Sequence, residues 1–134
     1  MKIHRAGSRP RKKASEDWFN GHVMQELIIE APEPARVRAI TVSFEPRART
    51  AWHTHPLGQT LFVLSGVGLV GLRNEAPQKI YTGDSIWIPP NQVHWHGATK
   101  DSPMQHIAIQ EALNGSVAEW LEKVSDDQYL SNIS

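Results

Sequence analysis

The stretch Trp52-His-Thr-His-Pro-Leu-Gly-Gln59 carries two histidines one residue apart and a glutamine just after a proline–glycine turn. In an extended chain alternate side chains share a face, so the rings of His53 and His55 point the same way, about 7 Å apart along the strand. The segment His94-Trp95-His96 repeats this spacing, and His106 follows it. Five of the seven histidines therefore fall between His53 and His106.

The histidine cluster predicts a divalent transition metal held by nitrogen and oxygen ligands. Neutral imidazole is the commonest metal ligand. The chain contains no cysteine, which excludes thiolate sites, disulfides and cysteine nucleophiles. A lone histidine on a strand is more often an ordinary packed or exposed residue. Two His-x-His pairs, a fifth histidine and Gln59 as an oxygen donor favour the metal site.

Short β-rich runs broken by proline, glycine and asparagine occupy most of the chain from residue 23 onward. Many short strands at nearly regular spacing predict an all-β sandwich or closed barrel. The Pro89-Pro90-Asn91 segment suits a tight turn, because Pro90 presets φ and Asn91 tolerates the left-handed conformation. The expected strands are Val23–Glu30, Val37–Phe44, Thr50–His55, Gln59–Leu64, Gly68–Leu72, Lys79–Tyr81, Ser85–Ile88, His94–Gly97 and His106–Gln110.

The end of the chain changes to a helical pattern. Ser116 and Glu119 form a capping-box signature, and an apolar stripe at helical spacing follows it. Ser125 and Gln128 repeat the signature for a second short turn. We therefore expect a short C-terminal helix whose stripe packs on the barrel; the stripe comprises Val117, Trp120, Leu121 and Val124.

The charge distribution separates a basic arm, residues 1–16, from the barrel domain, residues 17–134. The 134 residues carry 14 basic and 14 acidic side chains, but six of the basic ones lie in the first 13 positions. The rest of the chain is left with a formal charge of −6. Without interleaved aromatic residues the arm does not resemble a nucleic-acid-binding segment. No apolar run approaches the roughly 20 residues of a membrane span.

Other catalytic chemistries lack their motifs. There is no Gly-x-Ser-x-Gly segment for a serine nucleophile. The segment Ser65-Gly66-Val67-Gly68 lies between strands, where no helix follows to bind a phosphate. Asp126 and Asp127 belong to the terminal helical region and are expected to be solvated rather than paired for catalysis.

The two histidine segments resemble the two motifs of the cupins, small jelly-roll β-barrels with a metal inside. The first reads His53-x-His55-x3-Gln59-x6-Gly66 and the second Gly83-x5-Pro89-x-Asn91-x2-His94. Four positions depart from the motifs. Arg47 and Asn91 replace turn glycines, Ala98 replaces an asparagine, and Gln59 replaces the ligand glutamate.

A narrower resemblance, from about Asp17 to Tyr129, is to the bacterial manganese-dependent cupin hydroxynitrile lyases, which form and cleave cyanohydrins with (R) preference. It rests on Asp17-Trp-Phe19, Phe44-Glu-Pro46, Ala48 to Gln59, Gly83-Asp84, His94-Trp-His-Gly-Ala98 and His106-x-Ala-Ile109. The resemblance implies His53, His55, Gln59 and His94 as metal ligands and His106 as the acid/base residue. The implied ion is Mn²⁺, with Fe²⁺, Ni²⁺ or Zn²⁺ as substitutes.

Three neutral imidazoles and one neutral amide would leave a divalent ion its full formal double charge, which suits a Lewis-acid step on a carbonyl or its hydroxyl adduct. Together with this step, the resemblance implies a carbon–carbon lyase that acts on a small aldehyde or its cyanohydrin. Two alternatives remain at this point: an iron-dependent dioxygenase, and a small-molecule-binding cupin without catalysis.

The alternation of side chains along the strands predicts which residues line the pocket. Leu61 shares the face of Gln59, Ala108 and Gln110 share that of His106, and Ile40 and Val42 form the apolar face of their strand. We expect His96 to support the ligands rather than to bind the ion, and Trp52 and Trp95 to point away from them. The protein is further expected to be cytoplasmic and a homo-oligomer, a dimer or tetramer, with no nucleic-acid or membrane partner.

Overall fold

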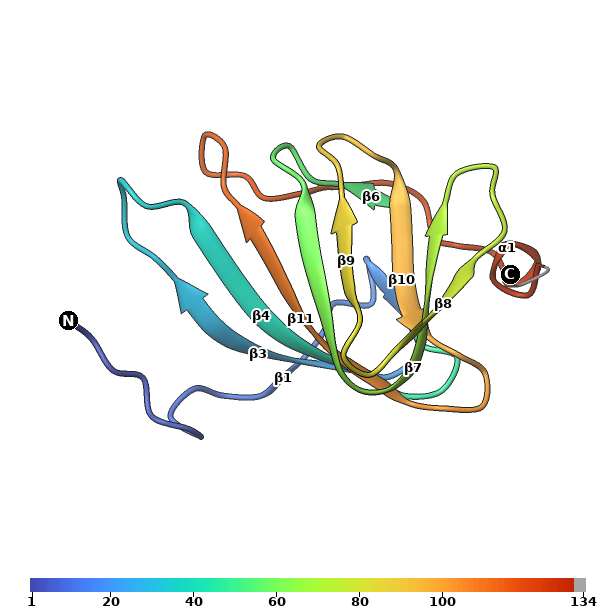
Figure 1. Cartoon of the computed structure of the whole chain (residues 1–134), viewed down its shortest axis with the longest axis horizontal. Coiled ribbons are helices and arrows are strands. Elements are labelled where there is room, and N and C mark those ends of the chain that lie inside the picture. The colour runs from blue at the N-terminus through green and yellow to red at the C-terminus, as the bar shows by residue number, and fades with distance from the viewer. Residues whose placement is uncertain (132–134) are drawn as a thin grey trace.

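One long strand, β7 (Gln59–Leu72), runs through the molecule and joins its two sheets (Figure 1). Its first half pairs with β11 (Met104–Glu111) and β9 (Ser85–Ile88), and its second half pairs with β10 (His94–Ala98) and β8 (Gln78–Tyr81). The strands predicted over Gln59–Leu64 and Gly68–Leu72 are therefore one strand. It bends at Gly66, whose φ is 78°, and a side chain there would collide with the carbonyl oxygen of Pro103.

The computed structural model, which describes residues 1–131, arranges the remaining strands on either side of β7. One sheet runs in the order β1 (Lys12–Lys13), β3 (Val23–Glu30), β4 (Val37–Phe44), β11, β7 and β9. The other contains β2 (Phe19–Asn20), β5 (Arg49–Thr50), β10, β7 and β8. Every pairing is antiparallel and the sheets curl toward each other (Figure 1). The predicted all-β barrel is confirmed.

The predicted strand Thr50–His55 is interrupted. Only β5 and β6 (His53–Thr54) are extended within it, and both pair with β10. His55 lies beyond the end of β6, in the turn that leads to β7. The two histidines of the first segment are therefore placed by different local structures, a strand and a turn.

The helix predicted from Ser116 to Val124 is wrong. Glu119–Trp120 form a short strand, β12, which pairs with β6, and Trp120 stacks on Trp18 with ring centroids 5.6 Å apart. Pairing with the free edge of β6 outweighs the local helical pattern, because it gives the backbone groups of β12 hydrogen-bond partners and also packs the indole of Trp120. The second signature is confirmed: Ser125 caps α1 (Asp126–Tyr129) in a complete capping box with Gln128.

Three apolar clusters stabilise the barrel, the smallest formed by Leu61, Ile88 and Ala108. The largest fills the interior, between the inward faces of the sheets, and includes Val23, Phe44, Val63 and Met104. The second lies behind β10, where Trp52 and Trp95 pack with Tyr129 under the C-terminal segment. Both tryptophans therefore point away from the histidines, as alternation along the strands predicted.

The helix α1 spans four residues, so no helix in the described part of the chain has the length or apolar character to cross a membrane.

Candidate metal centre

Four separate segments bring the five histidines and Gln59 into the barrel interior. β6 carries His53, β10 carries His94 and His96, β11 carries His106, and Gln59 begins β7. The antiparallel register places His94 directly opposite His53. All of these side chains are buried, and His94 and His106 have no exposed surface. The five histidines and Gln59 that the sequence analysis singled out therefore lie together inside the barrel.

The rings lie close enough to share an ion. Ring nitrogens of His53, His94 and His96 lie within 4.8 Å of one another. The ring of His55 is centred 4.9 Å from that of His53 and 5.4 Å from that of His94. Gln59 Oε1 lies 3.1 Å from His94 Nε2, so the amide oxygen faces the same space.

Backbone carbonyls fix three of the rings through Nδ1. His53 Nδ1 lies 2.9 Å from the carbonyl oxygen of Ala51, His55 Nδ1 2.7 Å from that of Val117, and His94 Nδ1 2.9 Å from that of Gln92. A carbonyl only accepts, so each Nδ1 carries the hydrogen and each Nε2 keeps its lone pair. This is the arrangement in which histidines bind metals. His55 Nε2 is also buried with no hydrogen-bond partner. These donors fit a divalent transition ion.

The remaining two histidines contact each other. His106 Nε2 lies 2.9 Å from Nδ1 of His96, so one hydrogen is shared between the rings. The outer nitrogens of the pair, His96 Nε2 and His106 Nδ1, are buried without a partner. The ring of Phe44 packs against both, with centroids 6.0 and 5.3 Å away. The pair thus adjoins the other histidines through His96 and an apolar ring through Phe44.

Burial keeps the five imidazoles neutral. It lowers the pKa of His94 and of His106 to about 4, and it lowers the pKa of His55. Burial, followed by repulsion from neighbouring rings, lowers the pKa of His53 and of His96 well below the usual value. Neutral rings are the metal-binding form, so the electrostatics of the site agree with the tautomers fixed by the carbonyls.

A second amide orients Gln59. Its Nε2 donates to Gln110 Oε1 at 3.1 Å, and Gln110 Nε2 donates to the carbonyl oxygen of Arg38 at 3.2 Å. This chain of donors and acceptors fixes which end of the Gln59 amide is oxygen. That oxygen is the atom turned toward His94.

A cavity of about 190 Å³ opens beside the histidines. This is smaller than the 300–1,000 Å³ typical of drug-sized ligands, which suits a small molecule. Among the residues predicted for the wall, Ile40, Val42, Ala108, Gln110 and His96 line it. Leu61 points inward but packs in the core with Ile88, and His106 lies behind His96, outside the lining. The described lining residues include no acidic side chain.

Sequence reasoning missed part of the wall. Val117, Ala118 and Trp120 line the cavity from the segment predicted to be helical, and Phe19, Gln25 and Thr50 complete it. Trp120 also lies over the ring of His53, with centroids 4.6 Å apart. The apolar stripe of the C-terminal segment was visible in the sequence, but its strand pairing was not. Three larger hollows, around Arg73, Arg36 and Lys123, are lined by none of the five clustered histidines.

Comparisons with known proteins agree with this geometry. The family model described as the cupin domain matches residues 40–110. A protein named (R)-mandelonitrile lyase from Granulicella tundricola is 48% identical over 129 residues, which are 96% of this chain and 98% of that protein. The crystal structure of a cupin-like protein from Thermotoga maritima superposes with a TM-score of 0.85 at 37% identity, covering 94% of this chain and 95% of that one.

The fold is also found in proteins of much lower sequence identity. The polyketide cyclase RemF from Streptomyces resistomycificus superposes with a TM-score of 0.74 at 19% identity, covering 96% of this chain and 90% of that one. At this identity the likeness concerns the fold alone.

Proposed function

The chain belongs to the cupin domain family, and from that premise we propose that it is a metal-dependent hydroxynitrile lyase, an enzyme that cleaves cyanohydrins to an aldehyde and hydrogen cyanide and forms them in reverse. The match to (R)-mandelonitrile lyase covers nearly the whole of both chains. One observation carries the proposal: the described residues that line a small, largely apolar cavity include neutral imidazoles and the Gln59 amide but no carboxylate.

We assign the ion to Nε2 of His53, His55 and His94 and to Oε1 of Gln59. Each of the three histidines donates its Nδ1–H to a backbone carbonyl, which leaves Nε2 free. His96 also lies within reach of His53 and His94, and its Nε2 is free as well, but the partner of its Nδ1 is the imidazole of His106, so either ring can carry the shared hydrogen. We therefore give His96 a role in proton movement and not in metal binding.

When bound, a divalent ion with only neutral ligands supplies Lewis-acid stabilisation of negative charge on a substrate oxygen. We propose Mn²⁺ ahead of Fe²⁺, Ni²⁺ and Zn²⁺, because the amide oxygen of Gln59 adds a hard ligand to the imidazoles. A chain without cysteine has no need of an oxidising compartment, and we place the loaded enzyme in the reducing cytoplasm.

The His96–His106 pair can both take and return a proton. If His96 Nδ1 donates to His106 Nε2, then His96 Nε2 is a base. If the shared hydrogen sits on His106 Nε2, then His96 Nε2–H is a donor. Cleavage of a cyanohydrin removes the hydroxyl proton, breaks the bond to the nitrile carbon and leaves the electron pair on cyanide, which takes up a proton. Uptake of the hydroxyl proton at His96 Nε2 gives the pair one positive charge, which the two rings share through their common hydrogen, and return of a proton from His96 Nε2 to cyanide restores the neutral pair.

The cavity wall selects the rest of the substrate. Ile40, Val42 and Ala108 offer an apolar surface to the aldehyde substituent, and Gln110 and Gln25 add polar groups at its edge. A volume of about 190 Å³ admits one small aromatic or aliphatic aldehyde adduct rather than a long chain. We propose (R)-mandelonitrile as a substrate.

The proposed function is tested with purified protein whose metal content is measured before assay. Each enantiomer of mandelonitrile is supplied separately, and benzaldehyde and cyanide are both quantified. We expect cleavage of the (R) enantiomer that is lost on chelation and restored by Mn²⁺. Stoichiometric oxygen uptake with strict dependence on Fe²⁺ would instead indicate a dioxygenase. Bound metal without turnover on a panel of cyanohydrins would indicate a binding protein.

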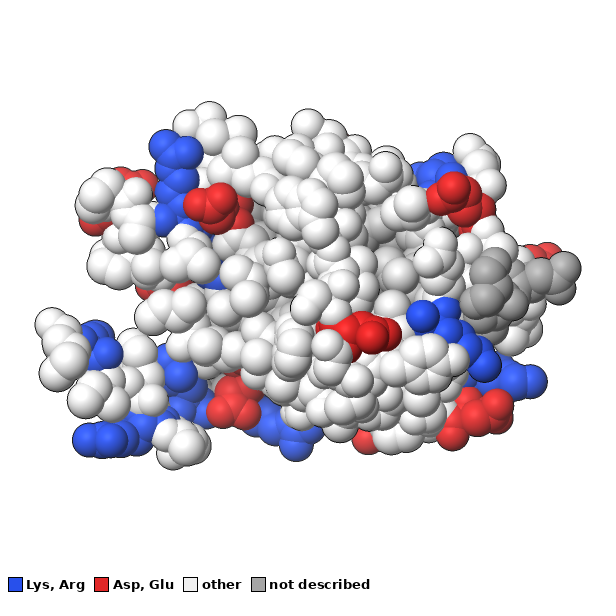
Figure 2. Space-filling view, viewed as in Figure 1, with Lys and Arg blue, Asp and Glu red and all other residues white. Residues whose placement is uncertain are grey.

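We propose further that two copies pack through the outer face of the β9–β7–β11 sheet. Trp87 and Ile109 flank Thr60 in one row of this face, and Phe62 and Leu64 continue it along β7; all four large side chains are more than a third exposed. Large exposed apolar groups gathered on one face mark an interface. Charges are sparse across the middle of the view in Figure 2, whereas lysines and arginines gather at the N-terminal arm.

The position and charge of the basic arm indicate that a second copy of the chain binds this face. It leaves the barrel through β1, at the edge of the same sheet, and its six basic side chains match a barrel of formal charge −6 in the partner. We expect Trp87→Lys to convert a dimer or tetramer into smaller species in light scattering after size exclusion. Tyr81→Lys, on the exposed β8, serves as the control. A monomeric unsubstituted protein would refute the interface.

A further inference from the structure

We infer that the C-terminal strap, residues 117–129, holds two of the proposed metal ligands in place, and that Arg49 and Tyr129 are the positioning residues that fasten this strap to the barrel. The inference rests on the metal site of the proposed function. It assigns a role to a part of the chain that supplies no ligand itself.

The strap contacts both histidines of the first segment. The carbonyl oxygen of Val117 accepts the Nδ1–H of His55 at 2.7 Å, and the indole of Trp120 lies over the ring of His53 at 4.6 Å. Trp120 is also the register partner of His53 between β12 and β6. On one side of this pair, Trp52 N donates to the Glu122 carbonyl at 3.0 Å and Leu121 N donates to the Trp52 carbonyl at 2.8 Å.

The histidine segment depends on this contact because its other support is limited. β6 is two residues long and pairs with β10 only at His94. His55 lies outside any strand, and its Nδ1 finds its hydrogen-bond partner in the strap. A short strand is held by its neighbours rather than by its own propensity. Displacement of the strap would therefore change the orientation of His55 first.

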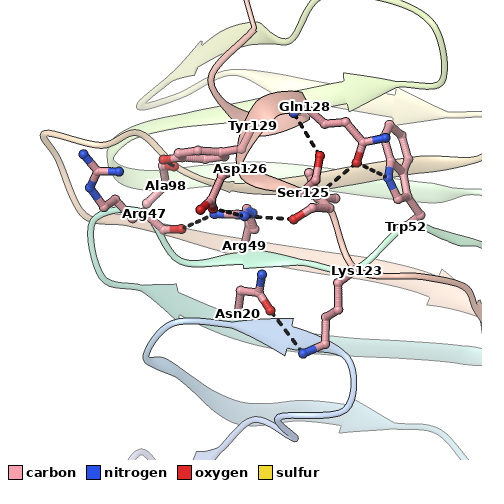
Figure 3. A network of polar contacts seen from close by, with 11 residues as sticks. Asn20, Arg47, Arg49, Trp52, Ala98, Lys123, Ser125, Asp126, Gln128 and Tyr129 are labelled. Carbon is pink, nitrogen blue, oxygen red and sulfur yellow. Dashed lines mark hydrogen bonds and ion pairs between the residues drawn. The ribbon is translucent and has the colours of Figure 1, made fainter.

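The far end of the strap is fastened by a buried arginine (Figure 3). Arg49 Nη2 donates to the carbonyl oxygen of Val124 at 2.8 Å and to Asp126 Oδ1 at 3.0 Å. Its Nη1 donates to the carbonyl oxygen of Arg47 at 3.3 Å. Because Arg49 belongs to β5, beside β10, it ties the strap to the sheet that carries His94.

Tyr129 completes the attachment. Its ring lies under the Arg49 guanidinium, 4.4 Å from ring centroid to Cζ, and its hydroxyl donates to the carbonyl oxygen of Ala98 at the end of β10. The ring is buried against Trp95. Trp52 Nε1 adds a bond to Gln128 Oε1 at 3.2 Å, in the same helix. Arg49, Ala98, Trp95 and Trp52 thus all contact this single turn of helix.

The decisive experiment compares Tyr129→Phe with Tyr81→Phe. The first removes the hydroxyl bond to Ala98 and keeps the buried ring, whereas the second removes an exposed hydroxyl on β8. Mn²⁺ affinity is measured by the electron paramagnetic resonance of free Mn²⁺, without substrate, at a temperature where both variants are fully folded. We expect Tyr129→Phe to weaken Mn²⁺ binding about tenfold, as loss of outer-shell support does in other metal sites, and Tyr81→Phe to leave it unchanged.

A second variant and a second readout separate positioning from general stability. Asp126 is exposed, so Asp126→Asn weakens the Arg49 contact at little cost to folding, and a smaller loss of Mn²⁺ affinity is expected. The Nδ1–H proton resonance of His55, protected by its bond to Val117, should broaden by exchange in both variants. If both variants keep the Mn²⁺ affinity and the His55 resonance of the unsubstituted protein while their melting temperature falls, the strap contributes only to stability and the inference is wrong.

The result of the Mn²⁺-affinity test does not depend on whether the protein cleaves cyanohydrins. A protein that binds Mn²⁺ but does not cleave cyanohydrins would refute the proposed activity and leave the affinity test intact. A protein that binds no Mn²⁺ would refute the metal site, and the His55 resonance would still decide whether the strap holds that ring.

Discussion

His106 Nε2 lies 2.9 Å from His96 Nδ1, and of these two buried rings only that of His96 lines the cavity. The contact crosses the barrel interior, since β11 and β10 flank β7 on opposite sides. His106 pairs with Val63 and His96 with Val70, seven residues further along the same strand. Any proton that His106 exchanges with substrate therefore passes through His96.

His106→Ala should abolish proton movement through the pair and leave the metal in place. We expect kcat to fall about 100-fold or more, the usual contribution of a positioned acid/base group, with unchanged Mn²⁺ stoichiometry. His22→Ala, at an exposed position remote from the cavity, is the matched control. A variant of His106 with normal kcat would remove this residue from the mechanism.

His96→Ala distinguishes a proton-transfer role from metal binding. If His53, His55, Gln59 and His94 hold the ion, the variant should retain Mn²⁺ measured by elemental analysis and lose activity to the same extent as His106→Ala. The double variant should then be no slower than either single one, because groups that act as a unit are not additive. Loss of Mn²⁺ from His96→Ala would place this histidine among the ligands instead.

The barrel and the gathering of the histidines were predictable because both follow from alternation. Side chains two apart on a strand share a face, so His94 and His96 had to point the same way, whereas His55 reaches the site from the turn beyond β6. The turn positions were readable too: Arg47 and Asn91, which stand where cupins carry glycine, adopt φ values of 73° and 63°. The backbone at these two turns therefore keeps a positive φ even though glycine is replaced.

The strap was not predictable, because its structure depends on a partner far away in the chain. Val117, Trp120, Leu121 and Val124 have helical spacing, and Ser116 offers a cap. Nothing local reveals that the edge of β6, more than 60 residues earlier, accepts Trp120 as a strand partner. The contact between His96 and His106 escaped prediction for the same reason, since it requires the bend of β7 at Gly66.

Removal of the metal should lower both activity and stability. An ion that binds only the folded chain stabilises it by about 2.7 kcal/mol at a free concentration 100 times Kd, or roughly 8 °C in Tm for a domain of this size. Differential scanning fluorimetry with and without chelator measures the shift. His53→Ala should show no added stability from Mn²⁺. An equal shift in that variant would indicate that the ion binds elsewhere.

Gln59→Glu tests whether the neutral charge of the ligand set matters. A carboxylate would reduce the net charge of the ion and its ligands from two to one, and with it the stabilisation of negative charge on the substrate oxygen. We expect kcat to fall at least about tenfold while Mn²⁺ stays bound, since a carboxylate is an equally good ligand.

The same substitution also disturbs the neighbouring amide, so a control is needed. Glutamate at position 59 cannot donate to Gln110 Oε1, which now accepts the Gln59 Nε2 hydrogen at 3.1 Å. Gln110→Glu keeps that acceptor and leaves the ligand neutral, although it places a charge in the cavity wall. Gln78→Glu, at an exposed position on β8, adds the same charge far from the ion. If Gln59→Glu retains full kcat with Mn²⁺ bound, ligand neutrality does not drive the reaction, and the shape of the cavity would have to account for it.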